Sequence, residues 1–263
     1  LLPGLIQSHT AFSRMSEIET VAAEVETMCG SELPEGESPV GLVFRDVTFR
    51  YPGNDKPILD HFSHVFRPGS KTAIMGETGA GKSTLLRLAL ALLRPQEGEI
   101  GVFTDRGGTE IYTPVSSESR KLFVYVPQGN SLLSGTIRHN LRIGNPTATE
   151  EEMKAALHDA AADFVFDLKF GLETTCGERG DGLSEGQAQR IAIARGLLTH
   201  GSILLLDEIS AALDEETETL LMRRLSERAA SKTILFITHR NAVLPFCDNI
   251  LKGRDGRGRA PML

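Results

Sequence analysis

Residues 76–84 read GETGAGKST, and this stretch decides how the rest of the chain is interpreted. It fits the spacing G-x-x-x-x-G-K-[ST], in which a glycine-rich turn leads into a helix. Glycines let the backbone turn several N–H groups towards an anion, and the helix that follows adds a positive N-terminus. The stretch therefore predicts a loop that cradles phosphate groups, preceded by a short buried strand within residues 69–76.

Each position of this loop has an expected role. Lys82 is expected to bring a mobile positive charge to the terminal phosphates, and the Ser83 hydroxyl is a candidate ligand for Mg²⁺. A glycine-rich turn that matches by chance is the alternative, and it would require the flanking strand and helix to be accidental too. The residues expected to bind the nucleotide here are Gly76, Glu77, Thr78, Gly79, Ala80, Gly81, Lys82, Ser83 and Thr84.

A second polar position follows the apolar run SILLLDE at residues 202–208. Ligands of α/β sheets bind at the carboxyl ends of strands, which is where Asp207 and Glu208 would stand. Asp207 is expected to hold Mg²⁺ through water, and Glu208 to act as the general base on an attacking water. Two solvated loop carboxylates are the alternative, and the phosphate loop upstream argues against it.

The apolar pattern predicts an α/β core with a mainly helical insertion. The continuous apolar runs at 202–208 and 232–239 suit a parallel sheet that is buried on both faces. Residues 40–52 and 121–128 also read as strands, the first of them with Phe44, Val47 and Phe49 in the core.

Helical periodicity marks three further segments. Residues 83–94 predict a helix that stops before Pro95, and residues 149–170 begin with a Thr149–Glu152 capping box. A third helix is predicted after Leu183 and ends at Gly201. The first helix is expected to bury one side, formed by Leu85, Leu88, Ala89, Leu92 and Leu93. The second is expected to bury Met153, Ala156, Leu157, Ala160, Ala161 and Phe164.

Composition narrows the classes of function. The chain has 263 residues, 40% of them hydrophobic, and a net charge of −7, which argues against a nucleic-acid surface. Its three widely spaced cysteines, Cys29, Cys176 and Cys247, indicate neither a disulfide framework nor a zinc site, and fit a reduced cytosolic setting. The sequence contains no recognisable signal peptide and no apolar run of membrane-spanning length. The first residue is not Met, which favours a piece of a longer protein.

Five further motifs follow the phosphate loop in a fixed order: YVPQ at 125–128, LSEGQ at 183–187, LLLDE at 204–208, ALD at 212–214 and ITH at 237–239. Over roughly residues 40–251 this set resembles the nucleotide-binding domain of ATP-binding cassette (ABC) transporters. The resemblance implies a P-loop NTPase (RecA-like) core with an antiparallel β subdomain and an inserted α-helical subdomain at about 130–185. It further implies a leader or linker from a membrane domain at 1–39, the ATPase domain at 40–252, and a C-terminal tail at 253–263.

The resemblance assigns three more residues to the nucleotide, with ATP and Mg²⁺ as the implied cofactors. Tyr51 resembles the aromatic residue that stacks on adenine, although a core tyrosine at a strand end would look the same. Gln128 matches the glutamine that reaches Mg²⁺ and the attacking water, and His239 the histidine that contacts the γ-phosphate and positions Glu208. A neutral loop amide and a structural histidine are their alternatives. The implied catalytic set is Lys82, Gln128, Glu208 and His239, and the implied metal set is Ser83, Gln128 and Asp207.

The LSEGQ stretch is implied to act across a dimer. In this family two domains pack head to tail, so Ser184, Gln187 and the N–H groups around Gly186 would hold the γ-phosphate of an ATP bound to Lys82 of a second domain. The ALD stretch ending at Asp214 resembles the loop that crosses this interface. Locally, Ser184 and Gln187 are also explained as a capping box, but Gly186 is not.

Two positions depart from the family pattern. Glu185 stands where glycine is usual, and Ala211 where serine is usual. A carboxylate close to a triphosphate repels it unless it points away, so hydrolysis at the site that uses this stretch is expected to be weakened.

The leading hypothesis is the Mg²⁺-dependent ATPase domain of an exporter. Residues 11–19, 44–52, 132–141 and 175–182 resemble exporter segments. The implied partners are a second nucleotide-binding domain, identical or different, and a transmembrane domain, with no nucleic acid. The implied location is the cytoplasmic face of the membrane, with this piece itself soluble. The alternatives are a detached importer subunit, a soluble cassette ATPase acting on nucleic acid or the ribosome, and a phosphate-loop kinase.

Overall fold

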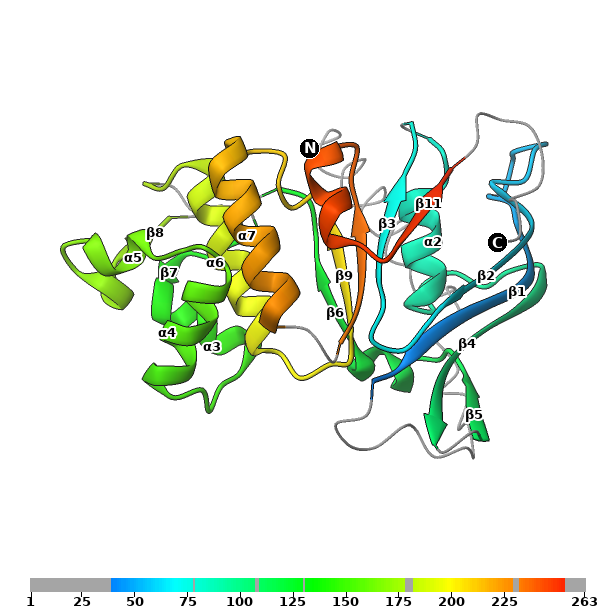
Figure 1. Cartoon of the computed structure of the whole chain (residues 1–263), viewed down its shortest axis with the longest axis horizontal. Coiled ribbons are helices and arrows are strands. Elements are labelled where there is room, and N and C mark those ends of the chain that lie inside the picture. Colours follow the sequence, from blue (N-terminus) through cyan, green and yellow to red (C-terminus); the bar gives the residue numbers. More distant parts are fainter. Residues whose placement is uncertain are drawn as a thin grey trace, which may run out of the picture.

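The computed structural model describes residues 39–77, 79–106, 109–129, 131–177, 182–228 and 232–253 (Figure 1). Within this part, five strands form a central sheet in which every pair of neighbours runs parallel. The prediction of a parallel sheet is therefore confirmed. Its strands, in spatial order, are β11 (Asn249–Lys252), β3 (Lys71–Met75), β10 (Thr233–Ile237), β9 (Ile203–Asp207) and β6 (Phe123–Val126).

An antiparallel sheet covers one side of this core (Figure 1). It contains β1, the strand predicted from residues 40–52, whose residues Phe44, Val47 and Phe49 are buried as expected. The antiparallel β subdomain implied by the resemblance is thus present. In spatial order the strands are β2 (Leu59–Phe66), β1 (Gly41–Phe49), β4 (Glu97–Arg106) and β5 (Thr109–Pro114).

The central strands β9 and β10 are buried on both faces of the parallel sheet, and successive residues of β9 serve opposite faces. In β9, Ile203 and Leu205 pack with the antiparallel sheet and α2 (Lys82–Ala89), whereas Leu204 and Leu206 pack with the helices on the other face. A fully buried side chain of this size stabilises the fold by roughly 2 kcal/mol, so both faces contribute to stability. This double burial is why the strand reads as a continuous apolar run.

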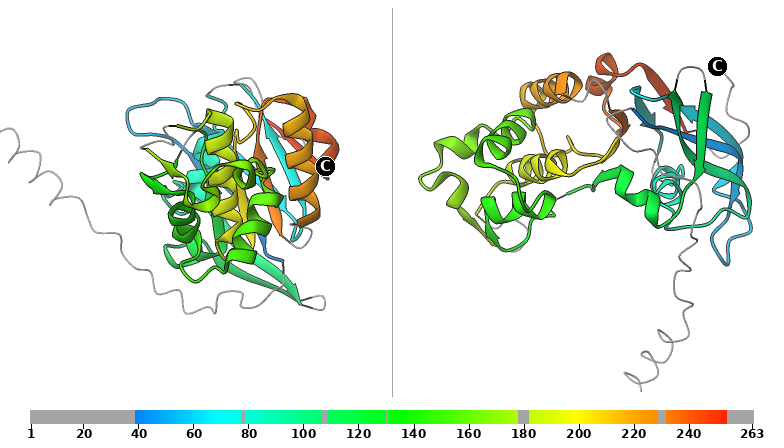
Figure 2. Two further views of the ribbon diagram at one scale, coloured as in Figure 1. Left: turned by 90° about the vertical axis from the view of Figure 1, so that its left-hand side faces the viewer. Right: turned by 90° about the horizontal axis from the view of Figure 1, so that it is seen from below.

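The second face carries the helical part of the chain (Figures 1 and 2). The capping box predicted at Thr149 and Glu152 is present at the start of α4. The helices of this part are α3 (Ile137–Gly144), α4 (Glu150–Asp159), α5 (Phe164–Asp167), α6 (Glu185–Leu198) and α7 (Glu215–Arg228). Shorter elements are β7 (Gly135–Thr136), β8 (Thr175–Cys176) and the 3₁₀ turns η1 (Glu118–Leu122), η2 (Gly171–Glu173) and η4 (Asn241–Phe246).

The helix after the phosphate loop is shorter than predicted. It ends at Ala89, and Leu92, expected on its apolar side, is 56% exposed. The side chain of Arg120 donates hydrogen bonds to the carbonyls of Leu90 and Ala91, both at 2.8 Å, and Ala91 has a φ of 50°. A contact from 30 residues further along the chain therefore satisfies carbonyls at the end of the helix, where the local pattern alone would continue it.

The predicted segment at 149–170 is broken as well. Five residues of its apolar face are buried as expected, whereas Phe164 is only partly buried. The helix α4 stops at Asp159, and Ala161 has a φ of 52° before the short helix α5 begins. The helix predicted to reach Gly201 likewise ends earlier, at Leu198.

Some predictions concern residues outside the described ranges: the leader at 1–38, Thr78, residues 178–181 and the tail from 254 onwards. Of the helices that are described, none combines the length and apolar character needed to cross a bilayer.

Candidate functional site

The phosphate loop and the predicted catalytic residues lie at the carboxyl ends of neighbouring parallel strands. Ile237 in β10 pairs with Ile74 in β3 and with Asp207 in β9, and β6 lies beside β9. The phosphate loop follows β3, His239 follows β10, and Gln128 follows β6. Strands aligned in this way place their following segments at one edge of the sheet, where α/β proteins bind ligands.

The phosphate loop uses its glycines for backbone conformation. Gly79 and Gly81 have φ angles of 89° and 86°, in the left-handed region that favours glycine. A Cβ atom at Gly81 would also lie 2.9 Å from Cγ2 of Ile58. Gly81 is the residue just before α2, so the loop delivers the chain directly into the N-terminus of that helix.

Lys82 lies over its own loop. Its Nζ donates hydrogen bonds to the carbonyls of Gly76, at 2.5 Å, and Glu77, at 3.0 Å. Backbone carbonyls are weaker partners for an ammonium than phosphate oxygens are, so this side chain can exchange them for an anion. Ser83, the next residue, is exposed, and its hydroxyl is accessible to a ligand.

Asp207, the last residue of β9, is a partly buried carboxylate. Burial raises its pKa above the ordinary value, as does the charge of Glu208, whereas a hydrogen bond from Tyr125 and the charge of Lys82 lower it. The positive charge of Lys82, at the end of the phosphate loop, thus acts on the carboxylate at the end of β9. The hydroxyl of Tyr125 donates to Oδ2 of Asp207 at 3.2 Å, and burial and this carboxylate raise the pKa of Tyr125 to about 12. Tyr125 therefore remains a neutral donor.

Glu208 has an unusual backbone conformation. Its φ is 45°, a left-handed value that costs a residue with a Cβ about 1–2 kcal/mol. Its N–H donates to the carbonyl of Ile237 at 2.9 Å, which fixes the turn after the strand. Strain of this kind concentrates at functional sites, and here it aims the Glu208 carboxylate between two side chains from other strands.

Those two side chains are Gln128 and His239. Nε2 of Gln128 donates to Oε2 of Glu208 at 3.0 Å, and Nδ1 of His239 lies 3.8 Å from Oε1 of the same carboxylate. His239 is 62% exposed, so its ring remains accessible. The structure thus brings together three of the four residues predicted as catalytic, and the fourth, Lys82, acts electrostatically on the adjacent Asp207.

Tyr51 lies against the start of α2. Its hydroxyl is 3.3 Å from Oγ1 of Thr84 and accepts a hydrogen bond from Arg87 at 3.1 Å. The contact with Thr84, and then Arg87, lower the pKa of Tyr51 against the opposing effect of burial. Its ring meets Phe49 edge to face at 5.0 Å, and it is only partly buried. These contacts give the ring a structural role, and one part of it stays exposed beside the phosphate loop.

The LSEGQ stretch forms the N-terminus of α6. Ser184 and Gln187 make the capping box in both directions, with N···O distances of 3.2 and 3.0 Å. A Cβ atom at Gly186 would lie 2.8 Å from the carbonyl oxygen of Ala212, so this glycine has a structural reason that sequence reasoning missed. Glu185 is exposed in the first turn, where a negative charge favours the helix dipole.

The structure places this stretch away from the phosphate loop of the same chain. The helix α6 packs on one face of the parallel sheet and α2 on the other, as Figures 1 and 2 both show. The two predicted phosphate-binding segments therefore do not form one site within the chain.

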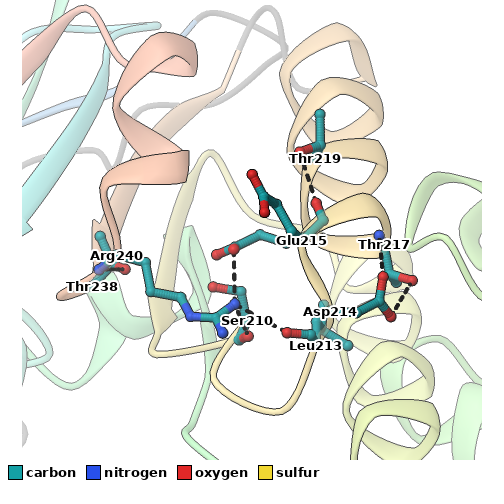
Figure 3. A network of polar contacts seen from close by, with 9 residues as sticks. Ser210, Leu213, Asp214, Glu215, Thr217, Thr219, Thr238 and Arg240 are labelled. Carbon is teal, nitrogen blue, oxygen red and sulfur yellow. Dashed lines mark hydrogen bonds and ion pairs between the residues drawn. The ribbon is translucent and has the colours of Figure 1, made fainter.

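The loop from Ser210 to Asp214, which we call the 210–214 loop, is shown in Figure 3. Asp214 caps α7: its Oδ1 accepts from the N–H of Thr217 at 2.9 Å and its Oδ2 from the Thr217 hydroxyl at 2.8 Å. These bonds lower the pKa of Asp214. An Asp three residues before a Thr at a helix start is a readable cap signal. The contacts of Arg240 with this loop carry no such signal.

The residues present suit a magnesium nucleotide. Within the described residues, no cluster of three acidic, His or Cys side chains forms a dedicated metal cage. Mg²⁺ commonly binds through one or two carboxylates together with phosphate oxygens and water, and Asp207 and the Ser83 hydroxyl are donors of that kind. The open backbone at Gly79, where a Cβ atom would meet nothing within 4 Å, leaves room beside the loop.

Comparison with known proteins gives a consistent result. A family model described as "ABC transporter" matches residues 59–211. An ATP-dependent lipid A-core flippase of Xylella fastidiosa is 37% identical over 233 residues, which are 86% of this chain and 39% of the flippase. A mycobactin import ATP-binding/permease protein of Mycobacterium tuberculosis is 33% identical over 98% of this chain and 44% of its own length. The structure of a bacterial Atm1-family ABC exporter with ATP bound superposes with a TM-score of 0.79 at 35% identity, covering 94% of this chain and 42% of the exporter.

Proposed function

The chain belongs to the ABC transporter family, and we propose that it is the ATP-hydrolysing domain of an exporter, whose cycle drives transport across a membrane. The observation that carries this proposal is the convergence of Gln128 and His239 on the Glu208 carboxylate, beside the phosphate loop. A general base needs to be in reach of the proton that it takes and to be oriented by its neighbours.

Each residue of the site has a task in hydrolysis. The backbone of residues 76–81 and the Lys82 ammonium bind the phosphates, and Glu208 accepts a proton from the attacking water. Gln128 and His239 hold the carboxylate and contact the water and the γ-phosphate. Ser83, Asp207 and Gln128 are the proposed ligands of Mg²⁺. The ion, when bound with the nucleotide, neutralises charge on the phosphates.

The second phosphate-binding segment is proposed to act in a head-to-tail dimer. The Ser184 hydroxyl accepts from Gln187, and its proton remains available for a phosphate oxygen of a second domain. Gly186 would bring its backbone N–H group to the same phosphate, Gln187 would hold the Ser184 side chain through the capping box, and Asp214 would lie near the interface. A nucleotide that binds the closed dimer more tightly than the open one then drives closure, and hydrolysis releases it. The second domain is identical or different.

The direction of transport rests on the relatives. The flippase and the Atm1-family exporter support an exporter, and the name of the mycobacterial relative supports import as the second candidate. The chain spans less than half the length of each of these three proteins. We propose that a transmembrane domain supplies the rest, and that this domain works at the cytoplasmic face of the membrane, while residues 1–39 lead into it from the membrane part and residues 40–252 form the ATPase domain.

Hydrolysis by the purified chain tests the proposal. Phosphate release from ATP should require Mg²⁺ and should rise more than linearly with protein concentration, because two chains complete each site. Replacing Lys82 with Ala should weaken ATP binding at least about tenfold, since a charge-assisted contact with phosphate is lost. Transfer of phosphate to a small molecule in place of water would indicate a kinase, and salt-sensitive binding of DNA or RNA would indicate the nucleic-acid class.

A further inference from the structure

Arg240 connects two segments of the site, the turn after β10 and the loop that follows Glu208. It follows His239 directly, and its side chain crosses to the 210–214 loop (Figure 3). Its Nη1 donates to the carbonyls of Ser210, at 3.0 Å, and Leu213, at 3.1 Å. One guanidinium nitrogen therefore donates hydrogen bonds to both ends of the turn that precedes Asp214.

The same nitrogen forms an ion pair with Glu218 on α7. The distance to Oε2 of Glu218 is 2.8 Å, and that side chain is only 3% exposed. The other carboxylate oxygen, Oε1, is buried and has no hydrogen-bond partner among the residues that the structure describes. Burying a carboxylate costs free energy unless a positive charge is paired with it. The Glu218 carboxylate therefore holds the Arg240 guanidinium in this position.

The 210–214 loop is tied to the rest of the site in two more places. The N–H of Ala211 donates to the carbonyl of Glu208 at 3.2 Å, which links the loop to the proposed base. The carbonyl of Ala212 is the group that leaves no space for a Cβ atom at Gly186, which links it to the start of α6. A shift of this loop would therefore displace both Glu208 and the start of α6.

We propose that the Arg240–Glu218 ion pair is a positioning device for hydrolysis, which keeps the 210–214 loop in fixed register with His239. The inference rests on the proposed function, since the step that it serves is ATP hydrolysis. Nucleotide binding at the phosphate loop does not depend on the pair, because that loop is anchored by β3 and α2. Loss of the pair then affects turnover far more than binding.

The alternative is that the Arg240–Glu218 ion pair only stabilises the fold and does not position the loop for hydrolysis. A second ion pair in the chain provides a control. Nη1 of Arg224, also on α7, donates to the carbonyl of His158 at 2.7 Å and pairs with the carboxylate of Asp163. The chemistry is similar: Nη1 of Arg224 holds one carbonyl and one carboxylate, whereas Nη1 of Arg240 holds two carbonyls and one carboxylate. The contacts of Arg224 lie within the helical part. Arg224→Met removes a comparable ion pair without touching the 210–214 loop.

The first measurement compares ATPase kinetics and thermal unfolding of Arg240→Met, Arg240→Lys and Arg224→Met. We expect Arg240→Met to lower kcat at least about tenfold with KM within about threefold, the pattern of lost positioning. Arg240→Lys keeps a positive charge for Glu218 and should recover part of kcat. Arg224→Met should lower Tm less, because Asp163 is 43% exposed and water screens its charge, and should leave kcat within about twofold. If Arg240→Met keeps its kcat, or if kcat follows Tm equally in both Met variants, the proposal is wrong.

The second measurement does not depend on hydrolysis. The N–H of Leu213 donates to the carbonyl of Ser210 at 3.0 Å, the same carbonyl that Arg240 holds, so amide exchange at Ala211 and Leu213 reports on the loop. We expect exchange there to be at least about tenfold faster in Arg240→Met than in Arg224→Met. Equal exchange would overturn the positioning role. An unaltered chain that lacks ATPase activity would instead refute the proposed function, and the exchange comparison would still decide whether the pair holds the loop.

Discussion

The side-chain amide of Gln128 donates a 3.0 Å hydrogen bond to Oε2 of Glu208 and so ties the loop after β6 to the end of β9. The two residues are 80 positions apart in the chain, and they meet because β6 and β9 are neighbours in the sheet. The contact uses one oxygen of the carboxylate, and His239 lies 3.8 Å from the other. The carboxylate is thus oriented from two sides, as a general base requires.

Replacing Glu208 with Gln should therefore abolish turnover while preserving ATP binding. The amide keeps the shape of the side chain and can still accept from Gln128, but it cannot take a proton. We expect kcat to fall at least about 100-fold and the Kd for ATP to stay within about threefold. Phosphate release and equilibrium binding of ATP, measured on the same preparation, check both parts.

Glu227→Gln is a suitable control, because this exposed residue near the end of α7 loses the same charge away from the site. It should hydrolyse ATP at the unaltered rate. Near-normal hydrolysis by Glu208→Gln would remove Glu208 from the role of base.

Asp207→Asn should stabilise the chain when Mg²⁺ and nucleotide are withheld. Burial raises the pKa of Asp207 above 3.8, so the folded state holds the proton more tightly than the unfolded state does. Stability is then lost as the pH rises from about 4 through the raised pKa, and the loss persists at neutral pH. Asn does not ionise, so at pH 7 its Tm should be higher by about 1–3 °C, a modest gain because solvent screens a carboxylate that is only partly buried.

The pH dependence of this gain in Tm tests whether the buried charge of Asp207 is its cause. The gain in Tm should shrink as the pH is lowered from 7 towards 4, because the Asp207 carboxylate is then increasingly protonated in the folded state. Asp55→Asn, at an exposed position, should show no comparable gain. A Tm difference for Asp207→Asn that stays constant over this range would show that burial of the charge is not its cause.

Much of the fold could be predicted from the sequence, because the signals are local. The double burial of β9 is visible in its unbroken apolar run, and the capping boxes at Thr149 and Ser184 need only residues three apart. The end of α2 could not be predicted, since Arg120 sets it from a distant segment. The left-handed φ of Glu208 and the three bonds of Arg240 were also missed, because tertiary contacts, not residue type, determine them.

Glu185→Gly should leave the ATP affinity of the monomer unchanged and alter only the hydrolysis that depends on the dimer. Glu185 is exposed in the first turn of α6, on the face of the sheet opposite α2, so it does not reach the phosphate loop of its own chain. In a head-to-tail dimer it would lie near the phosphates of the second domain, where its charge repels them. Because Gly weakens a helix start and the favourable charge is lost, a fall in stability of about 1 kcal/mol should accompany the change. A large change in monomer affinity, measured at a concentration where the chain is monomeric, would contradict this trans assignment.

Two substitutions of Tyr51 distinguish whether its ring stacks on the adenine base or only supports the fold. Its hydroxyl contacts Thr84 and Arg87, whereas its ring contacts Phe49 and is partly exposed. Tyr51→Phe removes only the hydroxyl, so it should cost about 1 kcal/mol of stability and leave the affinity for ATP nearly unchanged. Tyr51→Leu removes the aromatic face and should weaken ATP binding about tenfold, since stacking of a base on an aromatic ring contributes about 1–3 kcal/mol. Tripolyphosphate, which has no base, should bind both variants as it binds the unaltered chain. If Tyr51→Leu weakens tripolyphosphate as much as ATP, the ring supports the phosphate loop through the start of α2 and does not stack on adenine.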